Sequence, residues 1–347
     1  MERNTFNILS IDGGGIRGIF PAKFLSSLEH RLAEIGNDGS KIFQHFDLIC
    51  GTSTGGIIAI ALALGIPADR ILELYLNHAG DIFGKKRPWY QSLTHSKYTN
   101  SSLTAILKET FKDTSSGNDL RLNDCKTNIC IPIYDLFEGK PSVLKNNYHS
   151  GFTRDYHIPA YQAALATSAA PTYFDPFSGS YKKMQTETSE DFSNKVDGGV
   201  FANNPALLGI IEAQKAFGKN LSQIKVLSIG TGTRKFTDAK ERSKWGKFYW
   251  VNKMRIFDLF LQSQSQHTSN LISLLQNGVA RAESKNGGNF AYQRVDIEFD
   301  SNFTVELDET NKVALKRLAE KAATQFQNYG SSVIETYCSG GSSSTGL

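Results

Sequence analysis

Apolar positions along the chain follow two different periods. Short apolar runs rich in β-branched residues are typical of buried strands, and they occur at Phe6–Ile11, Phe46–Cys50, Asn128–Tyr134, Lys195–Val196 and Lys225–Ile229, with an alternating strand at Tyr292–Phe299. Apolar residues that recur every three or four positions predict helices at Pro21–Ile35, Ile57–Leu64, Ala68–His78, Ser101–Phe111, Pro159–Thr167, Ala206–Phe217, Ile256–Arg281 and Glu309–Tyr329. Strands that alternate with helices predict an α/β fold, with a mainly parallel central sheet and helices on both faces.

Three segments follow neither period. Residues Gly80–Tyr98 have no clear periodicity, and the polar segment Tyr181–Asn194 is predicted to be a surface loop. The end of the chain, SGGSSSTGL, is low in complexity, which is typical of disorder. Since no shift in composition marks a boundary, we predict a single domain over residues 1–337 and a disordered tail over residues 338–347.

Composition disfavours several classes of protein. The 347 residues carry 38 Lys and Arg against 34 Asp and Glu, and a net charge of +4 is too mild to indicate DNA or RNA binding. The four cysteines form no CxxC pair and no zinc-finger spacing, which favours a reducing compartment. The longest apolar run, Ile57–Ile66, is too short to cross a bilayer, and the first residues lack the pattern of a signal peptide. We therefore expect a cytoplasmic protein whose contact with a membrane is peripheral.

The segment GTSTG at residues 51–55 fits the G-x-S-x-G pattern between a predicted strand and a predicted helix. In that context a sharp turn exposes the serine hydroxyl at the carboxyl edge of the sheet, and the flanking Gly51 and Gly55 leave room for neighbouring backbone. The start of the following helix directs partial positive charge at the same place. We therefore predict that Ser53 is an activated nucleophile; the alternative is a Gly/Ser-rich turn without chemistry.

A second glycine-rich segment, DGGGIRG at residues 12–18, lies between the first predicted strand and the first predicted helix. Its glycines also fit the dinucleotide-binding fingerprint G-x-G-x-x-G. That fingerprint expects an acidic residue at the end of a second strand, whereas Glu29 and Glu34 lie within the predicted helix. A nucleotide-dependent oxidoreductase is therefore disfavoured.

The same glycine-rich geometry has another use in catalysis. Backbone N–H groups of consecutive glycines at the start of a helix can bind a tetrahedral oxyanion. We predict this role for Gly14 and Gly15, with Arg17 orienting the loop or adding positive charge. A tight turn that requires positive φ is the alternative.

A base for Ser53 has to be found elsewhere in the chain. Seven histidines are present, and none lies in a loop context arranged for catalysis: His30, His45, His78, His95, His149, His157 and His267. Asp197 follows a short apolar run and precedes two glycines, which suits a strand end. An aspartate hydrogen-bonded to the serine could accept its proton if a dry site raised its basicity. By itself the DGG segment is also consistent with a simple turn.

Three motifs in this order, DGGGIRG, GTSTG and DGG, resemble the patatin-like phospholipase family. The resemblance extends from about Phe6 to about Ile297, and it is supported by SAAPTYFDPF at 168–177, NNPALL at 203–208, SIGTGT at 228–233 and SKWGKFYW at 243–250. The third motif of the family is often DGA, and DGG is an accepted variant. The resemblance implies a patatin-like three-layer fold.

The resemblance also implies roles for matching positions. The catalytic pair would be a Ser53–Asp197 dyad, and the oxyanion hole would come from Gly13, Gly14 and Gly15, with Arg17 at the basic position of the family. The remaining motif glycines are Gly18, Gly51, Gly55, Gly198 and Gly199. The implied activity is the cleavage of ester-linked fatty acids from membrane phospholipids through an acyl-enzyme, without a metal or cofactor.

The size of the chain and its lack of extra domains resemble compact bacterial patatin-like effectors of anti-phage defence. That resemblance implies activation by a cyclic dinucleotide such as cyclic GMP-AMP, and action on the inner face of the membrane; a homo-oligomer is a further expectation. Contacts to the effector or to lipid are expected from Lys85, Lys86, Arg87, Trp89 and Tyr90. A solvated basic loop or a lid is the alternative. A constitutive lipase or esterase and a non-catalytic lipid- or nucleotide-binding module also remain as alternatives for the whole protein.

Overall fold

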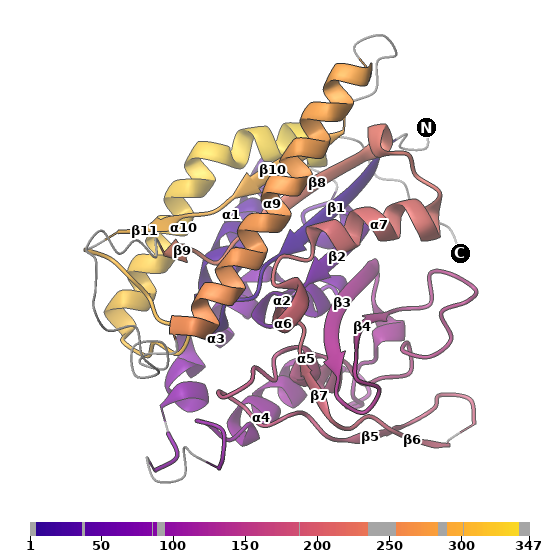
Figure 1. Ribbon diagram of the computed structural model, residues 1–347, viewed down its shortest axis with the longest axis vertical. Coiled ribbons are helices and arrows are strands. Elements are labelled where there is room, and N and C mark those ends of the chain that lie inside the picture. Colours follow the sequence, from indigo (N-terminus) through magenta and orange to yellow (C-terminus); the bar gives the residue numbers. More distant parts are fainter. Residues whose placement is uncertain are drawn as a thin grey trace, which may run out of the picture.

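The computed structural model describes residues 5–36, 39–84, 86–88, 94–186, 188–234, 255–283, 290–300 and 302–339. Within them, a seven-stranded sheet forms the middle layer (Figure 1). Its strand order is β10 (Ala291–Val295), β8 (Ile224–Ile229), β1 (Phe6–Ile11), β2 (Leu48–Gly51), β3 (Asn128–Asp135) and β4 (Lys140–Lys145), and β7 (Lys195–Asp197) also pairs with β3.

The five strands from β10 to β3 are parallel, and β4 and β7 run antiparallel to β3. Every residue of β1 and of β2 is buried. A continuous apolar run of this kind is typical of a parallel strand that is covered on both faces. The prediction of a mainly parallel sheet between two helical layers is confirmed.

Helices cover both faces of this sheet. In Figure 1, α7 (Ala206–Phe217) and α9 (Arg255–Glu283) lie in front of the sheet, and α7 contacts β1, β2 and β8. On the opposite face α2 (Thr54–Ala63) contacts β1, β2 and β3. That layer continues with α1 (Ile19–Glu34), α3 (Ala68–Phe83), α4 (Ser101–Thr110), α5 (Ala160–Thr167) and α10 (Lys312–Val333).

Helix α2 lies entirely inside the molecule. All ten of its residues are buried, and its sequence, TGGIIAIALA, is small or apolar on every side. A helix without a polar face has to be enclosed by other elements, and here the sheet, α3 and α5 enclose it. The first turn of α2 is thereby fixed rigidly at the end of β2.

The length of β3 brings two strand ends together. The first half of β3 pairs with β2, with Cys130 opposite Cys50, and the second half pairs with β7, with Ile133 opposite Asp197. Because β2 is parallel to β3 and β7 is antiparallel, the carboxyl ends of β2 and β7 approach each other along the same side of β3. Residues that follow β2 therefore meet the last residue of β7.

Several predicted boundaries were wrong. Residues 181–194, predicted to be a loop, contain parts of a hairpin of β5 (Ser180–Lys182) and β6 (Ser189–Asp191). Helix α3 continues past His78 to Phe83, through Gly80. The predicted strand at 292–299 is divided into β10 and β11 (Glu298–Phe299), which pairs with β9 (Thr233–Arg234).

The C-terminal part of the described chain ends in a π-helical turn, Ile334–Cys338, in which Cys338 is buried. The fold thus includes the first residue of the segment predicted to be a disordered tail, and residues 340–347 lie outside the described residues. In the part of the chain that the structure describes, no helix has both the length and the apolar character needed to cross a membrane.

Candidate active site

Ser53 occupies a strained turn between β2 and α2. Its φ of 56° and ψ of −125° lie outside the regions that side chains normally allow, as in a nucleophile elbow. The Ser53 N–H donates to Thr167 Oγ1 (3.1 Å), and the Thr167 hydroxyl donates to Pro132 O (2.8 Å). Both α5 and β3 therefore hold the turn in place.

Close packing explains the glycines beside Ser53. A Cβ on Gly51 would lie 2.1 Å from Gly55 O, and a Cβ on Gly55 would lie 2.3 Å from Ile11 O. Two strands and α2 thus meet without room for side chains. Gly18 and Gly198 are enclosed in a similar way.

Asp197 is the last residue of β7, and its carboxylate faces the Ser53 turn. It accepts a hydrogen bond from the Gly199 N–H (2.7 Å) and one from the Ser53 side chain. Only 3% of Asp197 is exposed, and burial raises its pKa to about 7, although the bonds from Ser53 and Gly199 oppose the rise. Among the described residues, no cationic side chain pairs with this carboxylate. It therefore has the basicity that proton abstraction near neutral pH requires.

The glycine-rich loop between β1 and α1 presents two free donors. The Gly13 N–H, expected to be part of an oxyanion hole, instead donates to Asn203 O (3.0 Å). The Ile16 N–H donates to Leu307 O (2.8 Å), and the Arg17 N–H donates to Gly14 O (3.1 Å). In the described structure only the Gly14 and Gly15 N–H groups of this loop remain without a protein partner, and both residues line the cavity that contains Ser53.

The conformation of Gly15 requires glycine. Its φ is +56°, and a Cβ at this position would lie 2.3 Å from Leu307 O. Gly14 is equally confined, since its Cβ would lie 2.2 Å from Thr231 Oγ1. The two N–H groups are thus held by packing on both sides of the loop.

Arg17 contacts this loop on the side away from the cavity. Its side chain is buried, its Nε donates to Gly14 O (3.4 Å), and its Nη2 lies 3.8 Å from Asp258 Oδ1. The guanidinium also lies over the Phe299 ring, 5.9 Å from the centroid. Because Arg17 does not line the cavity, its position fits orientation of the loop rather than contact with a substrate.

A buried ionic cluster, which the sequence did not predict, anchors the start of the same loop. Arg294 of β10 donates to both carboxylate oxygens of Asp12 (2.8 and 2.7 Å), to Ser228 Oγ (2.8 Å) and to Asp296 Oδ2 (2.7 Å). Burial raises the pKa of Asp12, and the bonds from Arg294 oppose that rise. Bidentate pairing of this kind fixes the position of the carboxylate as well as its charge.

Asn203, from the NNP segment after α6 (Gly199–Ala202), is a second residue whose role the sequence did not reveal. Its carbonyl accepts the Gly13 N–H, and its side-chain amide donates to Gly13 O (3.4 Å) and Ser265 Oγ (2.9 Å). Its Oδ1 is buried without a hydrogen-bond partner among the described residues. Asn203 therefore joins the glycine loop to the chain that follows Asp197, and it lines the cavity.

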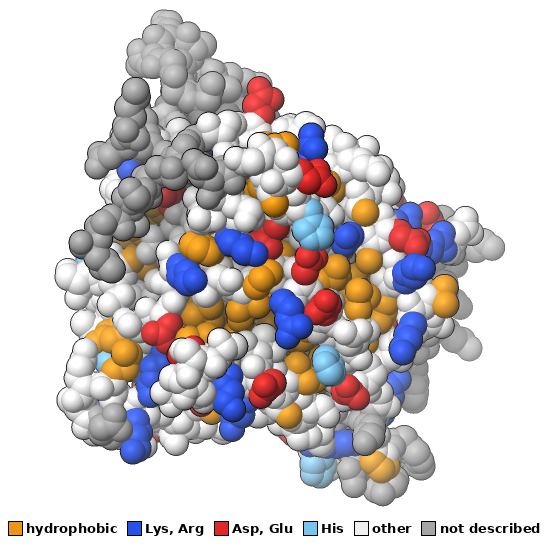
Figure 2. All heavy atoms as spheres, turned by 180° about the vertical axis from the view of Figure 1, so that it is seen from behind, with side chains coloured by type: hydrophobic (Ala, Val, Ile, Leu, Met, Phe, Trp, Pro, Cys, Tyr) orange, Lys and Arg blue, Asp and Glu red, His pale blue; other side chains and the backbone are white. Residues whose placement is uncertain are grey.

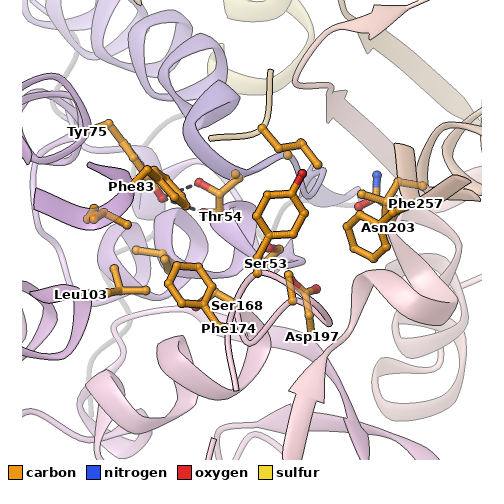
Figure 3. A pocket seen from close by; sticks show the side chains of 18 residues that line it. Ser53, Thr54, Tyr75, Phe83, Leu103, Ser168, Phe174, Asp197, Asn203 and Phe257 are labelled. Atoms are coloured by element: carbon orange, nitrogen blue, oxygen red, sulfur yellow. Dashed lines mark hydrogen bonds between the residues drawn. The ribbon is translucent and has the colours of Figure 1, made fainter. Parts of the chain in front are cut away.

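The cavity around Ser53 is polar at one place and apolar elsewhere. Figure 3 shows Ser53 and Asp197 at its centre, with Phe83, Leu103 and Phe174 on one side and Asn203 and Phe257 on the other. Further apolar walls come from Ile57, Ile82, Leu261 and Leu307. This composition suits an acyl chain whose ester carbonyl lies beside Ser53.

No histidine lines this cavity, although all seven lie in the described residues. His30 contacts Asp69 on the surface, and His78 contacts Asp81. The residues that the structure describes also contain no cluster of His, Cys, Asp and Glu that could hold a metal ion. Asp197 lines this cavity and has a raised pKa, so it is the best candidate for the base among the described residues.

The expected effector contacts are only partly described. Lys85, Trp89 and Tyr90 lie outside the described residues, and Lys86 is exposed. Arg87 is not free, because its guanidinium donates to Asp175 Oδ2 (2.8 Å) and Ser96 Oγ (2.8 Å).

Charge on the back of the molecule is mixed. In Figure 2, basic and acidic side chains alternate there, with hydrophobic side chains between them. The described residues on this face therefore form no single large basic patch, although the net charge of the protein is +4.

Known proteins resemble this chain in sequence. A family model described as patatin-like phospholipase matches residues 9–210. The chain is 28% identical to a cGAMP-activated phospholipase of Vibrio cholerae serotype O1, with 92% of this chain and 90% of the relative covered. It is 32% identical to patatin-like protein 4 of Arabidopsis thaliana, with 92% and 83% covered. It is 35% identical to a cGAMP-activated phospholipase of Escherichia coli, with 67% and 63% covered. Among solved structures, VipD from Legionella pneumophila superimposes with a TM-score of 0.40 at 11% identity, with 94% of this chain and 67% of VipD covered.

Proposed function

The chain belongs to the patatin-like phospholipase family, whose members hydrolyse lipid esters, and on this premise we propose that Ser53 and Asp197 form its catalytic dyad. The observation that carries the proposal is the buried Asp197 carboxylate, hydrogen-bonded to Ser53 and with its pKa raised to about 7. No histidine is close enough to share the role.

In the first half of the reaction, Asp197 accepts the Ser53 proton as the serine oxygen attacks the ester carbonyl. The Gly14 and Gly15 N–H groups stabilise the negative charge that develops on the carbonyl oxygen. As the carbon–oxygen bond to the alcohol breaks, Asp197 returns the proton to the leaving oxygen. A lysophospholipid departs and an acyl-serine ester remains.

In the second half, a water molecule takes the place of the alcohol. Asp197 accepts a proton from this water, whose oxygen attacks the acyl carbonyl, and the same glycine donors stabilise the oxyanion. The bond to Ser53 Oγ then breaks, and Asp197 returns the proton to the serine. The products are a free fatty acid and the original enzyme.

Active-site labelling with a fluorophosphonate probe tests the nucleophile, together with hydrolysis of a defined phospholipid. We expect Ser53→Ala to abolish both labelling and fatty-acid release. Ser168→Ala is a matched control, because Ser168 lines the same cavity but its hydroxyl is engaged by Ala164 O (2.7 Å). If the wild-type protein is neither labelled nor active even with cyclic GMP-AMP present, a non-catalytic binding module becomes the better hypothesis.

A cyclic dinucleotide such as cyclic GMP-AMP is proposed to switch this activity on, as part of anti-phage defence. Support comes from the relatives of Vibrio cholerae and Escherichia coli, which are named as cGAMP-activated phospholipases. Calorimetry with cyclic GMP-AMP, together with phospholipid hydrolysis with and without it, is the test. We expect binding and at least a tenfold rise in hydrolysis. Activity that is the same with and without the nucleotide would favour a constitutive lipase.

A further inference from the structure

Five exposed hydrophobic side chains lie at the end of the sheet where the catalytic cavity is found. They are Leu136 and Phe137 in the turn after β3, Val200 in α6, and Ile256 and Phe260 in the first turns of α9. Phe137 is 79% exposed and Phe260 is 60% exposed. We call these five residues the apolar rim. Their elements lie toward the lower part of Figure 1, where β3 ends.

Three of these residues share one groove. Leu136, Val200 and Ile256 line a groove of about 1170 Å³, although they come from three different elements. Phe137 follows Leu136 in the chain, and Phe260 lies one helical turn beyond Ile256 on the same face of α9. The two most exposed residues of the rim therefore lie next to groove-lining residues in the chain.

The groove lies beside the catalytic cavity. Phe174 lines both the groove and the cavity around Ser53. Helix α9 also borders both, because Phe257 and Leu261 line the cavity while Ile256 lines the groove. The apolar rim is therefore adjacent to the site that contains Ser53.

Three cations beside this groove are paired in the part of the chain that the structure describes. Lys195 pairs with Asp135 (2.6 Å), and Lys97 pairs with Asp308 (2.5 Å). Arg87 pairs with Asp175, which itself lines the groove. These three side chains therefore offer little free positive charge to the phosphate groups that Lys and Arg commonly bind.

We propose that the apolar rim inserts into the surface of a phospholipid bilayer and presents lipid esters to Ser53. The proposal rests on the proposed function, because it names the surface through which that site receives its substrate. The position of the rim beside the apolar cavity around Ser53 favours a lipid surface over a second copy of the chain as the occupant. Since Lys195, Lys97 and Arg87 are paired, we expect binding to depend on hydrophobic insertion more than on anionic lipid.

Flotation with phosphatidylcholine vesicles tests the proposal, with and without one third phosphatidylglycerol and at low and high salt. We expect Phe137→Ser and Phe260→Ser each to weaken vesicle binding about tenfold, which is the effect of removing most of one aromatic side chain from an apolar phase. Leu274→Ser is the matched control, because Leu274 is 67% exposed on α9 but lies 14 residues beyond Phe260. We expect that variant, the added anionic lipid and the salt each to change binding by less than about threefold.

Three results would overturn the proposal. Vesicle binding could be unchanged in both rim variants, or lost equally in Leu274→Ser, or dependent on anionic lipid and abolished by salt. Sedimentation analysis adds a fourth, since a loss of self-association in the rim variants alone would make the rim an interface between two copies of the chain.

A water-soluble ester separates this proposal from the proposed function. Hydrolysis of p-nitrophenyl butyrate and fluorophosphonate labelling, both measured with and without cyclic GMP-AMP, should be the same in wild type and in the rim variants. If the rim variants hydrolyse the ester and are labelled like wild type, and their vesicle binding is also unchanged, only the rim proposal fails. If the wild-type protein shows neither reaction, the catalytic proposal itself fails.

Discussion

The sequence Asp-Gly-Gly occurs twice at the carboxyl end of a strand in this sheet. Asp12 follows β1 and Asp197 closes β7, and both carboxylates are buried. Asp12 receives two hydrogen bonds from the Arg294 guanidinium, whereas Asp197 receives one from the Gly199 N–H and one from the Ser53 hydroxyl. The same tripeptide thus forms a neutralised anchor in one place and a basic carboxylate in the other.

This difference shows that side chains from other elements of the fold decide the chemistry of each aspartate. Burial raises the pKa of both carboxylates, but the Arg294 guanidinium opposes the rise at Asp12, whereas only a hydroxyl and an N–H group oppose it at Asp197.

The largest effect is expected from Asp197→Asn, which removes the basic carboxylate but keeps an oxygen that can accept from Gly199. We expect kcat/KM for phospholipid to fall by at least about 10³-fold, since general-base catalysis contributes about 10²–10⁴-fold. Steady-state assays measure it, with circular dichroism to verify folding. If the folded variant retained more than a tenth of the wild-type activity, Asp197 would not be the base.

On the other side of the contrast, Arg294→Met is expected to destabilise the protein. It would leave the buried Asp12 and the partly buried Asp296 without their cation, and removing one partner of a buried ion pair typically costs about 3–5 kcal/mol of unfolding free energy. Urea unfolding measures the loss. Adding Asp12→Asn to this variant should restore part of the stability, because one of the unpaired charges is removed. A loss below about 1 kcal/mol in the single variant would contradict an anchoring role.

The pKa of Asp197 predicts how activity depends on pH. A base works only when ionised, so the rate of hydrolysis of a soluble ester should be half-maximal near pH 7, level off at higher pH and fall about tenfold per unit at lower pH. A kcat/KM profile governed by a single ionisation near pH 7 is the expected result. A profile that stays flat down to pH 5 would mean that Asp197 is not titrating in the active enzyme.

The same pKa also affects stability. Because the folded-state pKa is raised above the ordinary value of 3.8, the folded protein binds an extra proton between about pH 4 and pH 7, and stability falls as pH rises through that window. The variant Asp197→Asn has no carboxyl group at this position, so its stability does not fall for this reason. Its advantage over wild type should grow from pH 4 to pH 7 and then remain level, at up to about 4 kcal/mol. The midpoints of thermal unfolding across pH measure this difference.

How much of this could be predicted from the sequence depends on how local the signal is. The Ser53 turn and Asp197 are marked by short motifs, and the structure places both at strand ends, where the motifs predicted them. Arg294 was missed because it lies 282 residues from Asp12, in a strand with no motif of its own. Asn203 lies in the NNPALL segment, but the sequence does not reveal its role, because its link to Gly13 forms only in the folded chain.

The fold shows the same dependence on local signals. The buried strand β1 was predicted with its observed bounds, and β2 and β8 with slightly different ones, because continuous apolar runs mark such strands clearly. The strand β4 was not predicted, since its sequence KPSVLK has the lysines and proline of an edge strand. The family resemblance implied that Gly13 is an oxyanion donor. The structure shows that its N–H group instead donates to Asn203 O, which the sequence alone does not reveal.

The smallest expected effect concerns the pair of Arg87 and Asp175, which can be compared with Arg294 and Asp12. Arg87 lowers the pKa of Asp175, but Asp175 is half-exposed, so solvent screens the pair and Arg87→Gln should cost less than about 1 kcal/mol of stability. Because Asp175 and Ser96 already use its donors, we also expect the affinity for cyclic GMP-AMP to change less than about twofold. Lys86→Gln is the matched variant, since Lys86 is exposed. Calorimetry on both decides: a tenfold weaker binding in Arg87→Gln would show that a phosphate displaces Asp175, so that this pair, unlike Arg294 and Asp12, opens on binding.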